Sequence, residues 1–207
     1  MLLRIHPDNP DERRLDQAVA LLKRDGVIVV PTDTVYSFAC VLGSAKGLER
    51  MSALKGIPLK DARFSIACAD LSHLSTYTRP LSNTIFKLMK KALPGPYTFI
   101  VPANNNVPKW FMGKRKTIGI RVPDNGTLLA LIERLDRPLV VSSVRDEDEV
   151  VEYTTDPELI AERFNTQVDA VIDSGYGSVD ASTVIDCTDG SAVVIVREGL
   201  GAVEGLL

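Results

Sequence analysis

The feature that most constrains this chain is a run of four apolar residues that stops at a proline. Residues 27–30 (Val-Ile-Val-Val) predict a β-strand buried on both faces of a sheet. Pro31 has no amide hydrogen to donate, so the strand must end there. Thr32, Asp33 and Thr34 follow at once, at the tip of a core strand, where open α/β sheets bind ligands. A turn capped by an Asx or Ser/Thr side chain is the alternative interpretation of these residues.

Length and composition favour one domain over residues 1–207. No apolar run approaches the roughly 18–20 residues of a membrane span, and the first residues lack the apolar core of a signal peptide. Cys40, Cys68 and Cys187 lie far apart in apolar segments and predict reduced core thiols in the cytoplasm. With only His6 and His73 present, we expect no metal site built from protein side chains and no tightly bound cofactor.

Charge is distributed unevenly along the chain. Residues 71–123 contain nine Lys or Arg and no acid, whereas residues 124–207 contain five bases and eighteen acids. A long segment without carboxylates builds positive potential, which favours a polyanion such as a nucleotide phosphate or an RNA backbone. The alternative is that the lysines of this segment are spread over solvated helix faces.

Apolar periodicity and breaker residues predict alternating helices and strands. We expect strands at 27–30, 64–68, 97–101, 117–122, 139–143, 168–173, 183–187 and 192–197, and helices at 11–24, 45–55, 82–93 and 127–135. Short helices are expected to begin at Asp70 and at Asp156, where Pro157 takes the first helical position. A charged loop is expected at 145–152. This order predicts one α/β domain with a mixed, twisted open sheet and flanking helices.

Polar side chains recur where the predicted strands begin or end. If these ends converge, they form a cationic pocket suited to carboxylates and phosphates, without a histidine base or nucleophilic triad. Its chemistry would be positioning and electrostatic stabilisation, as in nucleotidyl transfer with Mg²⁺. Each arginine taken alone is more often a surface ion-pair partner. The residues are Thr32, Arg121, Ser143, Ser182, Thr183 and Arg197.

Neither a P-loop nor a G-x-G-x-x-G motif is present, so the sequence does not support a Walker or Rossmann nucleotide site. Instead, PTDTVY at 31–36 resembles the P-T-[ED]-T-V-Y-G signature of the YrdC/YciO family, whose best-known members are threonylcarbamoyl-AMP synthases. Further blocks resemble that family in the same order and spread the resemblance over residues 27–199. They are KGIP at 55–58, PGPYT at 94–98, IRVP at 120–123, the strand at 138–143, STVID at 182–186 and REG at 197–199.

The resemblance implies a YrdC-like fold with a large concave basic cleft. It implies a reaction that joins L-threonine, bicarbonate and ATP, with Mg²⁺, into threonylcarbamoyl-adenylate and diphosphate, for threonylcarbamoyladenosine formation in tRNA. It assigns substrate binding to Thr32, Arg121 and Ser182, and nucleotide binding to Lys55, Ser143 and Arg197. These types agree with the assignment, because lysine is a mobile point charge suited to phosphate and arginine is a fork suited to carboxylate.

Three positions depart from the family pattern. Ile57 stands where the family has the Arg of K-x-R, Arg145 stands where it has the Asn of S-x-N, and Ser37 replaces the Gly of the opening signature. Losing one charge-assisted hydrogen bond, worth about 1.5–3 kcal/mol, predicts a roughly 10- to 150-fold weaker family reaction. Arg145 is a candidate for a compensating charge. These departures resemble the YciO branch of the family.

Two other functions fit the same residues. One is binding of double-stranded RNA or tRNA in the basic cleft without catalysis, which the acid-free segment 71–123 favours. Lys109, Trp110, Phe111 and the bases up to Lys116 interleave aromatic and basic residues, as RNA-binding surfaces do. The other is a ligand-binding relative of the synthases without catalysis. The sequence leaves the catalytic residues unassigned.

Overall fold

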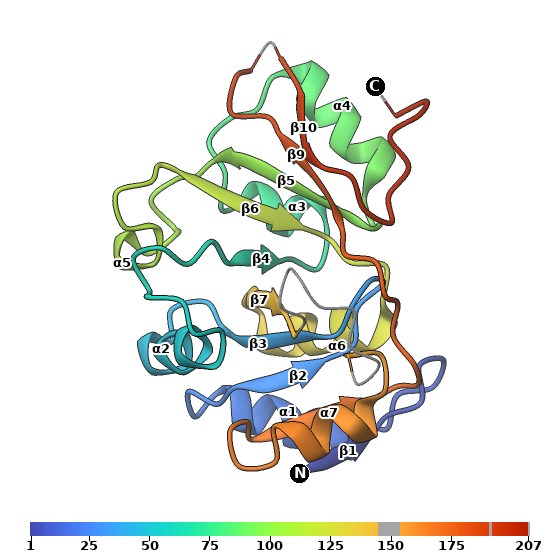
Figure 1. Cartoon of the computed structure of the whole chain (residues 1–207). Helices are drawn as coiled ribbons and strands as arrows, with labels where there is room; N and C mark the ends of the chain where they lie inside the picture. Colours follow the sequence, from blue (N-terminus) through green and yellow to red (C-terminus); the bar gives the residue numbers. More distant parts are fainter. Residues whose placement is uncertain (145–153, 191, 207) are drawn as a thin grey trace.

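The computed structural model describes residues 1–144, 154–190 and 192–206. Its strands form one mixed sheet in the order β1-β8-β2-β3-β7-β4-β6-β5-β9-β10, which runs from the bottom of Figure 1 to the top. The predicted α/β class and open mixed sheet are therefore confirmed. The strands are β1 (Leu2–Arg4), β2 (Ile28–Val30), β3 (Ser37–Val41), β4 (Ser65–Ala67), β5 (Tyr97–Pro102), β6 (Thr117–Arg121), β7 (Leu139–Ser143), β8 (Ala170–Asp173), β9 (Thr183–Asp186) and β10 (Val194–Arg197).

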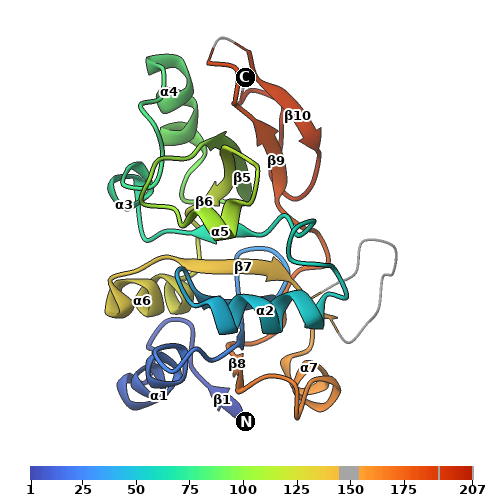
Figure 2. The same cartoon turned by 90° about the vertical axis from the view of Figure 1, so that its left-hand side faces the viewer.

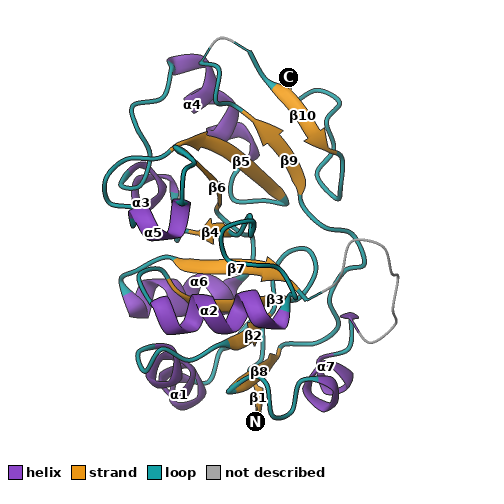
Figure 3. Cartoon of the chain, turned by 60° about the vertical axis from the view of Figure 1, so that its left-hand side comes forward, coloured by secondary structure: helices purple, strands orange, loops and turns teal. Residues whose placement is uncertain are grey.

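Helices lie on both faces of this sheet (Figures 2 and 3). The N-terminal ends of several helices follow from local sequence, because Asp11, Ser82 and Asp156 each cap a helix by accepting a backbone N–H with the side chain. The helices are α1 (Glu12–Leu22), α2 (Ala45–Leu54), α3 (Leu71–Ser75), α4 (Asn83–Ala92), α5 (Lys109–Met112), α6 (Gly126–Leu135) and α7 (Pro157–Arg163).

Strand β2 is buried on both faces, as its composition predicts. Ile28 and Val30 pack in the cluster that holds the apolar residues of α1 and α6. Val29 belongs to the other cluster, with Leu48 of α2 and Ile160 of α7. Successive side chains of a strand point to opposite faces, so an uninterrupted apolar run satisfies both cores.

Two strands, β1 and β3, were not predicted from the sequence. β1 is three residues long and pairs in parallel with β8. β3 follows the polar turn after β2, pairs antiparallel with it, and is buried at every position. Its sequence, SFACV, is short and mixed in character, and only pairing with β2 and β7 identifies it as a strand. The predicted charged loop at 145–152 lies outside the described residues.

The sheet brings remote strand ends into register. Ala67 of β4 lies opposite Arg121 of β6 in a parallel pair, and Ser37 of β3 lies opposite Ser143 of β7. Thr183 of β9 lies opposite Tyr97 of β5. These pairings place polar residues from distant parts of the sequence along one region of the sheet.

Of the described residues, none belong to a helix with the length and apolarity that crossing a membrane requires.

Candidate functional site

A cavity of about 790 Å³ lies over the sheet and is walled by residues of β3, β4, β5, β6, β7, β9 and β10. Its volume lies within the range of small-molecule sites, which is roughly 300–1,000 Å³. Four arginines and two acids are among the described residues of its wall, together with hydroxyl groups and apolar side chains. The charged residues are Arg63, Arg115, Arg121, Arg197, Asp180 and Glu198.

Arg121, at the end of β6, is a buried cation in this wall. Its Nη2 donates to Asp33 Oδ1 in an ion pair, and its Nη1 donates to Thr34 Oγ1 at 3.3 Å. Burial lowers the pKa of Arg121 from its ordinary value, the charge of Arg197 lowers it further, and Asp33 opposes both effects. Within the described residues, Arg121 Nε has no hydrogen-bond partner although it is fully buried. A buried donor without a partner costs free energy.

The two threonines of the turn after β2 have different positions. Thr32 does not line the cavity: its Oγ1 accepts from the Thr34 amide at 2.9 Å and donates to the Val35 carbonyl at 2.9 Å. Thr34 lines the cavity and contacts Arg121. The turn interpretation therefore describes Thr32, whose hydroxyl fixes the turn, while Thr34 presents its hydroxyl to the site.

Ser182 and Arg197 contact each other in the cavity wall. Ser182 Oγ and Thr98 Oγ1 share a hydrogen bond of 2.9 Å, and both residues line the wall. Arg197 donates from Nε and Nη2 to the Ser182 carbonyl, at 3.3 and 2.9 Å. This contact uses one side of the Arg197 guanidinium and fixes its position beside Ser182.

Lys55 and Ser143 are joined by a hydrogen bond. Lys55 closes the C-terminal end of α2, and its Nζ donates to the Ser143 carbonyl at 3.1 Å. Ser143 lines the cavity, whereas Lys55 is not one of its wall residues. Ser37, opposite Ser143, also lines the wall and is buried. The serine that replaces the expected glycine therefore adds a side chain to the cavity wall.

Of the sequence-predicted site residues, the cavity wall thus brings together Arg121, Ser143, Ser182 and Arg197. Arg145 lies outside the described residues. Ile57 is exposed, and its backbone carbonyl accepts a hydrogen bond from Ser52 Oγ. The described part of the chain contains no cluster of three or more His, Cys, Asp or Glu side chains able to hold a metal ion.

Two arginines of the wall, Arg63 and Arg115, were missed by sequence reasoning. Arg63 precedes β4, and Arg115 precedes β6. A signal was present, because β4 and β6 were both predicted as strands with a basic residue shortly before them. Nothing in the sequence indicates that the two strands are parallel neighbours.

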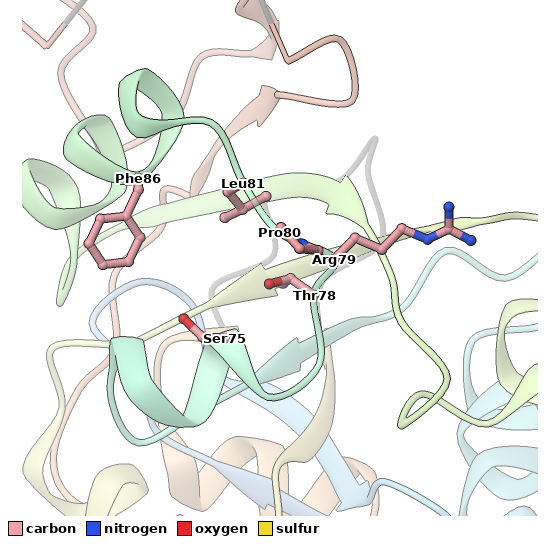
Figure 4. A pocket seen from close by; sticks show the side chains of 6 residues that line it. All are labelled: Ser75, Thr78, Arg79, Pro80, Leu81 and Phe86. Atoms are coloured by element: carbon pink, nitrogen blue, oxygen red, sulfur yellow. The ribbon is translucent and has the colours of Figure 1, made fainter.

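A second cavity, of about 210 Å³, lies between α3 and α4 (Figure 4). Ser75, Thr78, Leu81 and Phe86 surround it, and the guanidinium of Arg79 points away from the other labelled side chains. Arg79 Nε instead donates to the Ala103 carbonyl at 3.3 Å. This cavity offers hydroxyl groups and apolar surface but, among the described residues, no convergent charges, so the larger cavity is the candidate site.

Comparison with known proteins gives the cavity a context. The family model named Sua5, YciO and YrdC, described as telomere recombination, matches residues 20–199. The uncharacterised protein YciO of Escherichia coli is 43% identical over 205 residues, which cover 98% of this chain and 97% of that protein. A threonylcarbamoyl-AMP synthase of Halorhodospira halophila is 29% identical over 180 residues, covering 83% of this chain and 88% of that protein.

Two solved structures resemble the whole fold. The crystal structure of E. coli YciO matches with a TM-score of 0.91 and 42% identity, and covers 100% of this chain and 99% of that one. The crystal structure of Pyrococcus abyssi Sua5 complexed with L-threonine matches with a TM-score of 0.86 and 25% identity. That match covers 96% of this chain and 57% of the Sua5 chain, so this chain corresponds to part of the Sua5 protein.

Proposed function

This chain belongs to the Sua5/YciO/YrdC family, and from that premise we propose that it is a threonylcarbamoyl-AMP synthase-like nucleotidyltransferase. Its substrates would be L-threonine, bicarbonate and ATP, and its products threonylcarbamoyl-adenylate, diphosphate and water. The observation that carries the proposal is Arg121, a buried guanidinium in the cavity wall whose Nε has no partner among the described residues. The contacts with Asp33 and Thr34 use one N–H of each terminal nitrogen, and the remaining N–H donors of such a planar fork are suited to binding an amino-acid carboxylate.

The hydroxyl groups beside Arg121 complete the proposed amino-acid site. Thr34 and Ser182 line the same cavity and provide neutral donors and acceptors next to the cation. Thr32 supports this site indirectly, because its hydrogen bonds set the turn that presents Thr34. The substrate-binding role expected for Thr32 thus passes to Thr34 in this proposal.

The nucleotide would occupy the rest of the cavity. Arg197 lies beside Ser182, and Lys55 holds the strand end at Ser143. Mg²⁺ would arrive with ATP, since it binds through substrate phosphates and one or two carboxylates. Asp180 and Glu198 are carboxylates of the cavity wall. The barrier would fall through positioning and charge stabilisation as the carbamate oxygen attacks the α-phosphorus and diphosphate leaves.

The test is diphosphate release from ATP and Mg²⁺, measured with and without L-threonine and bicarbonate. We expect threonine-dependent release by the wild type and its loss in Lys55→Ala. Ile57→Arg restores a cation at the altered K-x-R position and is expected to increase the rate about 10-fold or more. Arg24→Gln, which changes an exposed residue after α1, is the control. Silence of both the wild type and Ile57→Arg would contradict the proposal.

A second candidate function is RNA binding at the same face. Trp110 of α5 is 45% exposed, next to Lys109, while its neighbours Phe111 and Met112 line the cavity. An exposed aromatic ring among basic residues is typical of surfaces that stack bases and contact phosphates. The two functions are compatible if the product serves tRNA modification. This second function would be supported if the wild type binds a short RNA duplex with an affinity that falls steeply with salt, and if Trp110→Ala binds the same duplex more weakly.

The proposed cellular site is the cytoplasm. Cys40, Cys68 and Cys187 are buried free thiols, a state that suits a reducing compartment.

A further inference from the structure

Arg63 and Arg115 come from segments far apart in the chain and meet at one edge of the sheet. Each stands two residues before a strand, Arg63 before β4 and Arg115 before β6. The two strands are parallel neighbours, with Ser65 opposite Gly119. The N-terminal ends of parallel neighbours lie at the same edge, so the two arginines reach the cavity side by side.

Arg115 is held in place by the backbone. Its Nη2 donates to the Ala62 carbonyl at 2.6 Å and its Nε to the Met112 carbonyl at 3.2 Å. The first of these bonds ties Arg115 to the residue before Arg63. Two donors are thereby fixed, and the planar guanidinium is set in one orientation toward the cavity.

The two cations share this edge without compensating acids. Within residues 1–144, 154–190 and 192–206, no carboxylate lies within salt-bridge distance of either guanidinium, and Arg63 makes no hydrogen bond through its side chain. Burial lowers the pKa of Arg115 from its ordinary value, and the charge of Arg63 lowers it further. Like charges held together cost free energy, which a bound anion between them would recover.

We propose that Arg63 and Arg115 form a second anion site in the cavity, which binds the polyphosphate of a nucleotide. The inference rests on the proposed function in one respect, since it names the part of the same cavity that holds the nucleotide's charge. Arg121 binds the carboxylate at one end of the cavity, Arg197 contacts the nucleotide beside it, and Arg63 with Arg115 binds the phosphates that extend to the other end.

The spacing of the two ends fits one extended ligand. Arg121 is the last residue of the five-residue strand β6, and Arg115 precedes its first residue. A strand of this length spans about 13 Å from first residue to last. The two anion sites are therefore far enough apart for one extended ligand to place a carboxylate at one and phosphates at the other. The cavity of about 790 Å³ is continuous between them.

The surroundings favour a nucleotide over an RNA backbone at this pair. Phe64, Phe111 and Ile118 line the cavity beside the two arginines and are buried. A concave apolar wall next to the fixed guanidinium of Arg115 encloses a small ligand, whereas a duplex backbone binds along an open groove.

The test is calorimetric binding of inorganic tripolyphosphate to the full-length chain and to variants. Arg63→Gln is the primary variant because its side chain makes no hydrogen bond or ion pair within the described residues. We expect it to bind tripolyphosphate about 10- to 100-fold more weakly than the wild type. Arg63→Gln with Arg115→Gln should bind it more weakly still, and Arg24→Gln should bind it like the wild type. Thermal unfolding of Arg63→Gln should match that of the wild type, which separates lost binding from lost folding.

Unchanged tripolyphosphate affinity in folded Arg63→Gln would overturn the inference. So would a variant that loses affinity for a short RNA duplex but keeps its affinity for tripolyphosphate, because the pair would then serve a nucleic-acid backbone. Absence of tripolyphosphate binding in the wild type would overturn it as well. The proposed function is tested separately, by L-threonine binding and threonine-dependent diphosphate release, so the proposed function and the second anion site can fail independently.

Discussion

Asp33 and Arg121, 88 residues apart in the chain, form a buried ion pair, and Arg121 lines the candidate site. The second oxygen of Asp33, Oδ2, accepts a hydrogen bond from the Asp124 amide at 3.1 Å. One carboxylate therefore links the turn after β2 to both the end of β6 and the segment that follows it. The side chains are 8% and 7% exposed, so each charge depends on the other for compensation.

Replacing Asp33 by asparagine should destabilise the fold. The amide of Asp33→Asn would keep an acceptor for Arg121 but leave the buried guanidinium without a counter-charge, at a cost of about 3 kcal/mol in the free energy of unfolding. Urea denaturation of the variant and the wild type measures this. The control is Arg4→Gln, which breaks an exposed ion pair with Glu158 and a longer contact of 3.4 Å with Asp173, and should change the urea midpoint much less. Equal effects of the two substitutions would contradict the importance of burial at Asp33.

Arg121→Lys should weaken binding of L-threonine while it keeps the positive charge. A lysine provides a point charge without the planar fork, so a bidentate carboxylate contact is lost. We expect an affinity about 10- to 100-fold lower, measured by calorimetry. Arg63→Gln should bind L-threonine like the wild type, because Arg63 precedes β4, the parallel neighbour of β6, whereas Arg121 is the last residue of β6. An unchanged affinity in Arg121→Lys would show that the carboxylate binds elsewhere.

Gly199 should tolerate no side chain. A Cβ there would collide with the Ala181 carbonyl oxygen and lie 2.8 Å from the carbonyl carbon of Ser182. These are backbone atoms of the cavity wall, so Gly199→Ala must shift the segment that positions Ser182 and Arg197. We expect a loss of about 3 kcal/mol in unfolding free energy and weaker ligand binding. Gly190→Ala, where nothing lies within 4 Å of the added Cβ, should change stability by less than about 0.5 kcal/mol.

His73 should make stability fall at mildly acidic pH. Its Nδ1 accepts from the Ala69 amide at 3.2 Å, and burial lowers its pKa below the ordinary value, against the opposing charges of Asp70 and Asp136. The unfolded chain therefore binds this proton first as the pH falls, so the stabilisation is complete above about pH 6.5 and is lost as the pH drops toward the lowered pKa. Urea unfolding at about pH 8 and about pH 5.5, on either side of that ordinary pKa, should show a larger loss for the wild type than for His73→Gln. His6→Gln should retain the wild-type difference, and an equal loss in all three proteins would exclude this role of His73.

Much of the local structure follows from short stretches of sequence. The uninterrupted apolar run of β2 requires two cores, and the capping residues Asp11, Ser82 and Asp156 place three helix starts correctly. These features depend on neighbouring residues, whose periodicity and hydrogen-bonding groups act over one or two turns. The family signatures likewise lie in continuous blocks.

The composition of the site depends on the tertiary structure. Of two nearby hydroxyl residues, Thr32 closes the turn through its hydrogen bond to the Val35 carbonyl, and Thr34 lines the cavity and accepts a hydrogen bond from Arg121. Arg63 and Arg115 become neighbours only because β4 pairs in parallel with β6.

The sequence by itself determined the α/β class, most helices and strands, and the presence of polar groups at strand ends. The order of the strands, their register and the partners of each charged side chain were decided by the tertiary structure. The physical reason is that strand pairing joins segments far apart in the chain. Its energy comes from packing and hydrogen bonds across the sheet, which no local pattern of residues contains.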